Sequence, residues 1–147
     1  MRVALGSDHA GVALKRDVRK LLDELHVEYV DLGSDTDSPV DYPDYARIVC
    51  REVVEGRVDA GILICGTGIG MAMAANKIHG VRAASASDVE TARLAREHND
   101  ANVLALGART TSIDRAMAVV KVFLSTQFAG GRHARRIGKI AEMEQQS

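Results

Sequence analysis

The sequence is poor in several features that mark broad classes of protein. It has no tryptophan, and only 3% of its 147 residues are aromatic, so it offers few side chains on which nucleic-acid bases could stack. Its only cysteines, Cys50 and Cys65, are too few for a disulfide framework and are typical of reduced cytoplasmic thiols. Neither sign of charge is in large excess, because 19 Lys and Arg residues stand against 20 Asp and Glu residues. We therefore expect no nucleic-acid partner, and any anion must be bound by a local group of residues.

Long hydrophobic runs are also missing. The first apolar residues are followed at once by Ser7, Asp8 and His9, before the core of a signal peptide is complete. The longest stretch without charge, residues 60–76, contains several glycines and is too short to span a membrane. We therefore expect a cytoplasmic protein without a membrane partner. A chain of 147 residues that is 46% hydrophobic has the size of one globular domain, so we expect residues 1–147 to form a single domain.

Short apolar runs alternate with amphipathic stretches along the whole chain. This alternation predicts an α/β fold, a Rossmann-like three-layer sandwich in which a parallel sheet of about five strands lies between helices. The spacing of apolar residues predicts helices within 14–25, 42–53 and 113–124, and the charged residues after Gly131 predict a C-terminal helix in a basic tail, 130–147. The predicted strands are Val3 to Leu5, Tyr29 to Leu32, Ile62 to Cys65, Val81 to Ala84 and Val103 to Leu106.

Polar residues lie next to the predicted strands. Ligands of open α/β sheets bind at the carboxyl ends of the strands, so the residues that follow each strand are candidates for a site. If all the strands are parallel, we expect these residues to meet at one edge of the sheet. They are Ser7, Asp8, His9, the segment 65–70, Arg109, and His98 with Asn99 at the end of the helix before the last strand.

The glycine-rich segment 65–70, Cys-Gly-Thr-Gly-Ile-Gly, is the most informative of these. A strand enters it and small residues after it predict a helix, so its backbone N–H groups could bind a phosphate or a developing oxyanion. The alternative is a tight turn that needs glycine only for its geometry. Met71 stands where a dinucleotide-binding Gly-x-Gly-x-x-Gly would have its last glycine, and no P-loop sequence is present. A non-catalytic module that binds nucleotides or phosphorylated metabolites is therefore the weaker alternative.

Two residues near this segment could transfer protons. Neighbouring N–H groups would favour the thiolate form of Cys65, which could then remove a carbon-bound proton; the alternative, an inert buried cysteine, fits Cys50 well. His98 could donate or accept a proton near neutral pH, or it could be structural. Asp8 and His9 could join Cys65 and His98 as zinc ligands, but their spacing matches no metal-binding signature, so we predict no metal site.

Two arginines in the basic tail are spaced for anion binding. Arg132 and Arg136 lie one helical turn apart, so their guanidinium groups would share one face of a helix and suit a phosphate. The alternative is a solvated basic end of the chain, or a modest nucleic-acid contact.

Four motifs, taken together, resemble one enzyme family. They are Gly6-Ser-Asp-His-Ala-Gly11, Ile64-Cys-Gly-Thr-Gly-Ile-Gly70 with Ala74-Ala-Asn-Lys77, His98-Asn-Asp100, and Gly130-Gly-Arg-His-Ala-Arg-Arg136. Each motif alone is modest, but their order and spacing over nearly the whole chain are similar to those of type B ribose-5-phosphate isomerases. The motifs are also similar to those of the related galactose-6-phosphate and allose-6-phosphate isomerases.

The resemblance implies an aldose-ketose isomerase of the pentose phosphate pathway that interconverts ribose 5-phosphate and ribulose 5-phosphate through ring opening and a cis-enediolate. It implies that Cys65 is the base that moves a proton between C2 and C1, that Thr67 assists it and that His98 opens the sugar ring. Some members of the family carry a carboxylate base where this chain has Met71, which strengthens the assignment of Cys65.

The resemblance also bears on ligands and assembly. It implies that no cofactor is needed and that the protein is a homodimer or homotetramer whose active sites are shared between subunits. An isomerase for allose 6-phosphate or galactose 6-phosphate is the alternative within the family. The substrate and phosphate contacts that it implies are Asp8, His9, Tyr42, Gly66, Gly68, Ile69, Gly70, Asn99, Arg109, Arg132 and Arg136.

Overall fold

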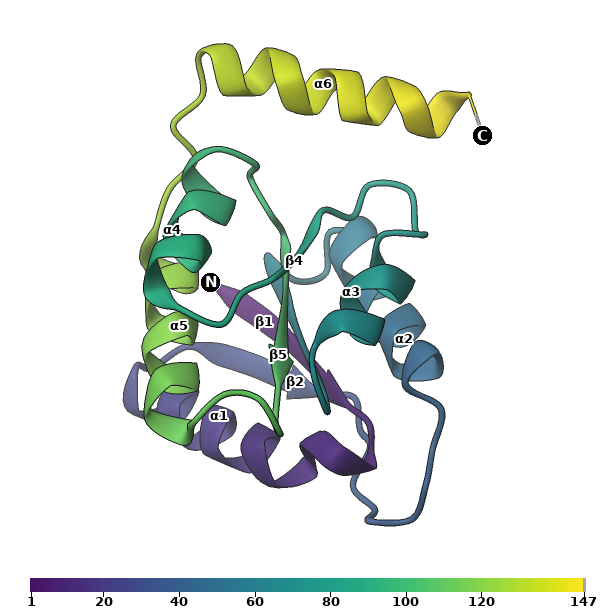
Figure 1. Ribbon diagram of the computed structural model, residues 1–147, viewed down its shortest axis with the longest axis vertical. Helices are drawn as coiled ribbons and strands as arrows, with labels where there is room; N and C mark the ends of the chain where they lie inside the picture. Colours follow the sequence, from purple (N-terminus) through teal and green to yellow (C-terminus); the bar gives the residue numbers. More distant parts are fainter. Residues whose placement is uncertain (147) are drawn as a thin grey trace.

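Five parallel strands form the centre of the protein in the computed structural model, which describes residues 1–146 (Figure 1). They are β1 (Arg2–Ser7), β2 (Glu28–Asp31), β3 (Ala60–Cys65), β4 (Ala83–Ser85) and β5 (Val103–Gly107), in the order β2-β1-β3-β5-β4 across the sheet. The predicted α/β fold with a parallel sheet is confirmed. β4 begins later than predicted, because the Arg82 N–H donates to the Asn102 side chain (2.8 Å) instead of entering the strand ladder.

Helices pack on both faces of this sheet. α1 (Val12–Glu24), α4 (Val89–Glu97) and α5 (Ile113–Ser125) cover one face, while α2 (Tyr42–Val54) and α3 (Ile69–Ala75) cover the other (Figure 1). A single turn of 3-10 helix, η1 (His9–Gly11), joins β1 to α1. The predicted three-layer arrangement is therefore confirmed. On each face of the sheet, the helices and strands bury a separate cluster of apolar side chains.

The two-residue period of the strands decides which layer each side chain enters. On β3, Ile62 and Ile64 pack in the core under α1 and α5, whereas Leu63 and Cys65 belong to the core under α2 and α3. All six residues of β3 are buried, as expected for a central strand covered on both faces. This alternation places the Cys65 side chain on the α2 and α3 side, at the carboxyl end of the sheet.

The strand order reverses between β1 and β3, and this point is where an open α/β sheet has its crevice. α1 follows β1 on one face and α2 leads to β3 on the other, so the connections diverge at this point. Ligands of open α/β sheets bind at such a point, outside the carboxyl ends of the strands. Because Ser7 pairs with Ile64, the next residues, Asp8 and Cys65, lie on its two sides.

The C-terminal helix α6 (Arg132–Gln145) does not cover a face of the sheet. It lies across the end at which the strands begin, above α4 in Figure 1. Among its described residues only His133 is buried, while Ile140 and Met143 are 45% and 68% exposed. Its last turn is held by Glu144, whose carboxylate accepts the Gly80 N–H at 3.1 and 3.2 Å. The predicted C-terminal helix is confirmed.

The helices can also be compared with the thickness of a bilayer. Within residues 1–146, no helix combines the length and the apolar character needed to cross a membrane.

The fit between the sheet and the glycine-rich segment predicts an effect on stability. A Cβ on Gly107, the last residue of β5, would lie 2.6 Å from the carbonyl oxygen of Thr67, a backbone atom that cannot rotate away. We expect Gly107→Ala to lower the free energy of unfolding by about 2 kcal/mol, measured by urea titration. Gly138→Ala is the control, because nothing lies within 4 Å of a Cβ at that position in α6. Equal stability of the two variants would contradict this packing.

Candidate active site

The glycine-rich segment 65–70 connects the end of β3 to α3. Gly68 has a φ of +79° and precedes the helix, a backbone conformation that favours glycine. Gly66 and Gly70 permit close contact, because a Cβ on Gly66 would lie 3.3 Å from the Arg109 side chain and one on Gly70 would lie 2.7 Å from the Tyr42 ring. The glycines are therefore needed both for the turn and for close packing around it.

The Cys65 thiol faces the backbone of this turn. The Gly68 N–H donates to Cys65 Sγ over 3.2 Å, and the Ile69 N–H donates to Thr67 Oγ1, also over 3.2 Å. An N–H aimed at sulfur is a hydrogen-bond donor for negative charge that develops on it during a reaction. Cys65 is only 5% exposed, yet it lines an open pocket. It is therefore a buried residue whose sulfur lies at the wall of a cavity.

The second cysteine has a different environment. Cys50 is fully buried on α2, and burial raises the pKa of its thiol to about 12. It therefore stays protonated at neutral pH, in agreement with the inert role expected for it.

Asp8 and His9 lie opposite the segment, after β1. One oxygen of Asp8, Oδ1, accepts the N–H groups of Ala10 (3.0 Å) and Gly11 (3.2 Å), so Asp8 caps η1 while it lines the pocket. His9 Nδ1 accepts the Val40 N–H at 3.2 Å. Both side chains are thus oriented by backbone groups close to them in the fold.

A pocket of about 470 Å³ joins these elements. It lies at the carboxyl ends of the strands, where Tyr42 opens α2 and Arg109 follows β5. Gly68 lies behind the pocket wall, where a Cβ would be 3.0 Å from the backbone of Leu106. The predicted residues that line the pocket are Asp8, Tyr42, Cys65, Gly66, Thr67, Ile69, Gly70 and Arg109.

Met73 also lines this pocket, although the sequence analysis did not single it out. Its side chain is 66% exposed, and it lies one helical turn after Ile69, which is 55% exposed. Two apolar residues four positions apart, on a helix that starts at a candidate site, were the signal that could have revealed it.

Four predicted site residues lie at the opposite end of the sheet, which corrects the expectation that all of them meet at one edge: His98, Asn99, Arg132 and Arg136. His98 and Asn99 follow α4, and this helix runs back to the end at which β5 begins (Figure 1). The five residues of β5, at about 3.3 Å per residue, keep the two ends at least about 13 Å apart. A helix between two parallel strands must end where the second strand starts, so His98 lies far from Cys65 within one chain.

His98 belongs to a separate cluster of basic side chains. Its ring stacks on that of His133, with 4.2 Å between centroids and 11° between planes. The pKa of His133 is lowered, chiefly by burial and then by the positive charges of His98, Arg132 and Arg136, while Glu97 opposes this change. Arg132 and Arg136 are exposed, one turn apart, at the start of α6, as predicted. The cluster therefore presents two guanidinium groups beside a pair of stacked imidazoles.

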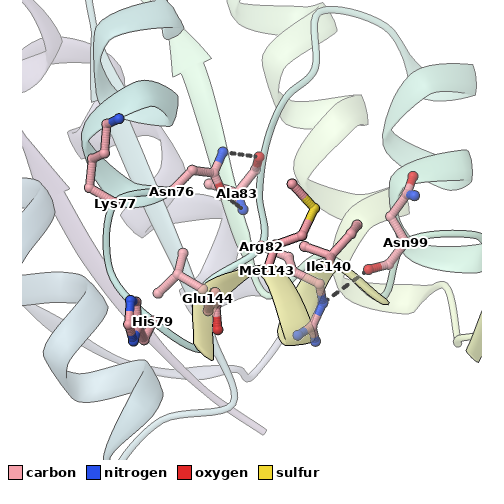
Figure 2. A pocket seen from close by; sticks show the side chains of 10 residues that line it. Asn76, Lys77, His79, Arg82, Ala83, Asn99, Ile140, Met143 and Glu144 are labelled. Carbon is pink, nitrogen blue, oxygen red and sulfur yellow. Dashed lines mark hydrogen bonds between the residues drawn. The ribbon is translucent and has the colours of Figure 1, made fainter. Parts of the chain in front are cut away.

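A second cavity, of about 610 Å³, is lined by Asn99, the residue after His98, and by residues of α6 (Figure 2). Asn99 lines one side of it and Ile140, Met143 and Glu144 of α6 line another, as Figure 2 shows. The Asn99 carbonyl oxygen accepts a hydrogen bond from Arg82 Nε at 3.1 Å. The predicted polar residue Asn99 therefore borders a different cavity from the one at Cys65.

The four residues considered as zinc ligands do not lie together in this arrangement. His98 lies at the other end of the sheet from Asp8, His9 and Cys65. Within residues 1–146, no group of three or more His, Cys, Asp or Glu side chains is placed to hold a metal ion.

Comparisons with known proteins agree on one family. The sequence profile of the Ribose/Galactose Isomerase family matches residues 3–140. Ribose-5-phosphate isomerase B of Escherichia coli is 44% identical over 144 residues, which cover 98% of this chain and 97% of that protein.

Solved structures give the same result. Ribose-5-phosphate isomerase B of Clostridium thermocellum superposes with a TM-score of 0.98 at 46% identity, covering 99% of both chains. The Mycoplasma genitalium enzyme with bound ribulose-5-phosphate has a TM-score of 0.95 at 43% identity and covers 99% of this chain and 97% of that one. With the fold, the glycine-rich turn and the family motifs all in agreement, the chain belongs to the ribose/galactose isomerase family.

Proposed function

We propose that this protein interconverts ribose 5-phosphate and ribulose 5-phosphate. The observation that carries the proposal is the position of the Cys65 thiol. Its sulfur accepts a hydrogen bond from the Gly68 N–H, and it lines a pocket where the strand order reverses between β1 and β3. The Escherichia coli relative is named a ribose-5-phosphate isomerase, and the Mycoplasma genitalium structure contains ribulose-5-phosphate. A thiol poised in this way is suited to take a proton from carbon.

The chemistry needs a base and a means of holding negative charge. In the open-chain aldose, the Cys65 thiolate removes the proton from C2, and the electron pair moves to the carbonyl oxygen on C1 to give a cis-enediolate. The thiol then returns the proton to C1, while the hydroxyl proton on O2 moves to O1, which completes the ketose. Amides in the first turn of α3, such as that of Gly70, have no partner four residues back within the helix and can donate to the enediolate oxygens.

The pocket at Cys65 has a polar wall for the sugar. In this proposal Thr67 holds the loop through its contact with the Ile69 N–H, and Asp8 receives a sugar hydroxyl on the carboxylate oxygen that does not cap η1. Tyr42 and Ile69 form the sides of the pocket. His9 and Arg109 bind the phosphate, because both lie at this end of the sheet and can donate hydrogen bonds to an anion.

A second copy of the chain supplies the remaining groups in this proposal. In an isologous dimer, His98, Asn99, Arg132 and Arg136 of one protomer lie against the Cys65 pocket of the other, where His98 opens the ring and the arginines hold the phosphate. The separation of the two groups of residues within one chain supports this arrangement. A tetramer would then be a pair of such dimers, and the whole chain, 1–147, acts as one isomerase domain with α6 as the arm that reaches the partner.

The environment of the thiols supports a cytoplasmic location. Cys50 and Cys65 form no disulfide, and a base that acts as a thiolate has to stay reduced. We therefore place the activity in the cytoplasm.

The choice of sugar is tested by a direct comparison. The family's description includes galactose, and six-carbon sugar phosphates differ from ribose 5-phosphate by one hydroxymethylene group. We expect kcat/KM for ribose 5-phosphate to exceed the values for allose 6-phosphate and galactose 6-phosphate. Tight binding of NAD or ATP without turnover of any sugar phosphate would instead indicate a nucleotide-binding module.

Removing the thiol should slow isomerisation strongly without unfolding the protein. We expect Cys65→Ala to lower kcat by a factor of about 10² to 10⁴, because a positioned base typically accelerates an enzymatic reaction by this factor. The measurement is ribulose 5-phosphate formation, with circular dichroism to confirm the fold. Cys50→Ala is the matched control and keeps its activity. Near-normal turnover by Cys65→Ala would exclude the thiol as the base.

Removing an arginine of α6 should affect binding more than chemistry. We expect Arg136→Ala to raise KM for ribose 5-phosphate about tenfold with a smaller change in kcat, because the phosphate is held equally in ground and transition states. Arg135→Ala removes an exposed neighbour and serves as the control. If KM is the same in both variants, Arg136 does not hold the phosphate.

The shared site predicts complementation between inactive variants. Cys65→Ala and His98→Ala proteins, unfolded together and refolded in equal amounts, should regain about a quarter of wild-type activity, because half of the dimers are mixed and each mixed dimer has one intact site. Each variant refolded alone is the control. A mixture with no more activity than its components would mean that each chain builds its own site.

A further inference from the structure

The connection between β2 and α2, residues 32–41, lies at the carboxyl end of the sheet without helix or strand structure. It passes beside the residues that follow β1 and ends at the start of α2, where Tyr42 lines the Cys65 pocket. We call this segment the 32–41 connection. Because a connection without regular structure has no hydrogen-bond ladder of its own, its position depends on contacts with the rest of the fold.

Lys15 of α1 is the charged anchor of this connection. It is 1% exposed, and its Nζ donates to Asp31 Oδ1 and to the Ser34 carbonyl oxygen, both at 2.7 Å. Asp31 Oδ1 also accepts the Gly33 N–H at 2.9 Å. A lysine is almost never fully buried unless its charge is paired, so the ammonium group is committed to these partners.

The anchored residues are also tied to β1, directly before Asp8 and His9. The Ser7 N–H donates to the Gly33 carbonyl oxygen and the Ser34 N–H donates to the Ser7 carbonyl oxygen, both at 2.8 Å. Lys15 and these backbone bonds together hold the point at which the 32–41 connection leaves the sheet, next to the site.

A chain of tight turns carries this position forward along the connection. Ser34 Oγ accepts the Thr36 N–H at 3.2 Å, and Thr36 Oγ1 accepts the Ser38 N–H at 3.0 Å. Pro39 follows and restricts its own φ. The next residue, Val40, donates its N–H to His9 Nδ1 at 3.2 Å. The orientation set at Ser34 thus reaches the imidazole of His9 through a short, internally bonded segment.

The contact from Val40 decides which nitrogen of His9 carries the proton. A nitrogen that accepts a hydrogen bond has no proton of its own, so the neutral ring holds its proton on Nε2. His9 then presents an N–H donor on the side away from Val40, as a phosphate oxygen requires.

We propose that Lys15 is a positioning residue, which holds the 32–41 connection so that Val40 keeps His9 in the tautomer that donates from Nε2 to the substrate phosphate. This inference rests on the proposed function, because it takes the phosphate of a sugar phosphate as the group that His9 meets. Lys15 acts only through the connection and His9 and does not touch the substrate.

The test replaces the ammonium group by an apolar end of similar length. We expect Lys15→Met to raise KM for ribose 5-phosphate about tenfold and to change kcat by less than about threefold, because phosphate binding is lost equally from ground and transition states. In long-range ¹H–¹⁵N spectra of the free enzyme, with His9→Gln used for assignment, the His9 ring should change from one tautomer to a mixture. A purely structural lysine would leave both KM and the His9 spectrum unchanged.

Two further variants separate position from charge. Arg19→Met removes the other cation at Asp31, which lies 3.3 Å away and is exposed, and it should leave KM and the His9 spectrum at wild-type values. Lys15→Met combined with Asp31→Asn removes both charges of the Lys15–Asp31 pair, so it protects the measurement against effects of removing one charge alone. Its KM should stay raised, because the Ser34 carbonyl oxygen still lacks its donor.

The outcomes distinguish this inference from the proposed function. A folded Lys15 variant with wild-type KM and a single His9 tautomer overturns the role of Lys15. Absence of ribose 5-phosphate turnover in the wild-type enzyme overturns the proposed function instead, and the His9 spectra then still decide whether Lys15 controls the tautomer.

Discussion

The reversal of strand order between β1 and β3 is the constraint on which the candidate site depends. Because the connecting helices leave these strands toward opposite faces, the backbone opens at their carboxyl ends. The register of Ser7 with Ile64 then sets Asp8 across from Cys65. The glycines of segment 65–70 let the chain turn into α3 and bring the Gly68 N–H to the Cys65 sulfur. The thiol, the turn and the pocket thus follow from one feature of the topology.

The same topology separates the residues of the site into two groups. Helices between parallel strands run in the opposite direction to the strands, so residues after a strand and residues after a helix lie at opposite ends of the sheet. Cys65 ends β3 and Arg109 follows β5, whereas His98 follows α4 and Arg132 opens α6. Each end carries part of the chemistry expected of the family. The oligomer with shared sites that we propose would make use of both ends.

Electrostatics act differently at the two ends. At the carboxyl end the charged groups are held by backbone contacts or buried pairs, as with Asp8 on η1 and Lys15 with Asp31. At the amino end the stacked rings of His98 and His133 lie beside exposed arginines, and burial, followed by the nearby positive charges, lowers the pKa of His133. The first arrangement orients groups inside one chain, while the second presents positive charge outward to solvent.

Local patterns in the sequence were sufficient to predict the parallel sheet, the flanking helices and the turn from strand to helix at segment 65–70, because strand periodicity, helical spacing and glycine content are properties of neighbouring residues. They were also sufficient to separate Cys65, at a strand end, from Cys50, on an apolar helix face. The position of His98 at the other end of the sheet from Cys65 was missed, although it follows from the predicted parallel strands, because the helix before β5 has to end where β5 begins. The sequence could not show the burial of Lys15 or the contact between Val40 and His9. These features join residues far apart in the chain, and only the packing of α1, β2 and the 32–41 connection brings them together.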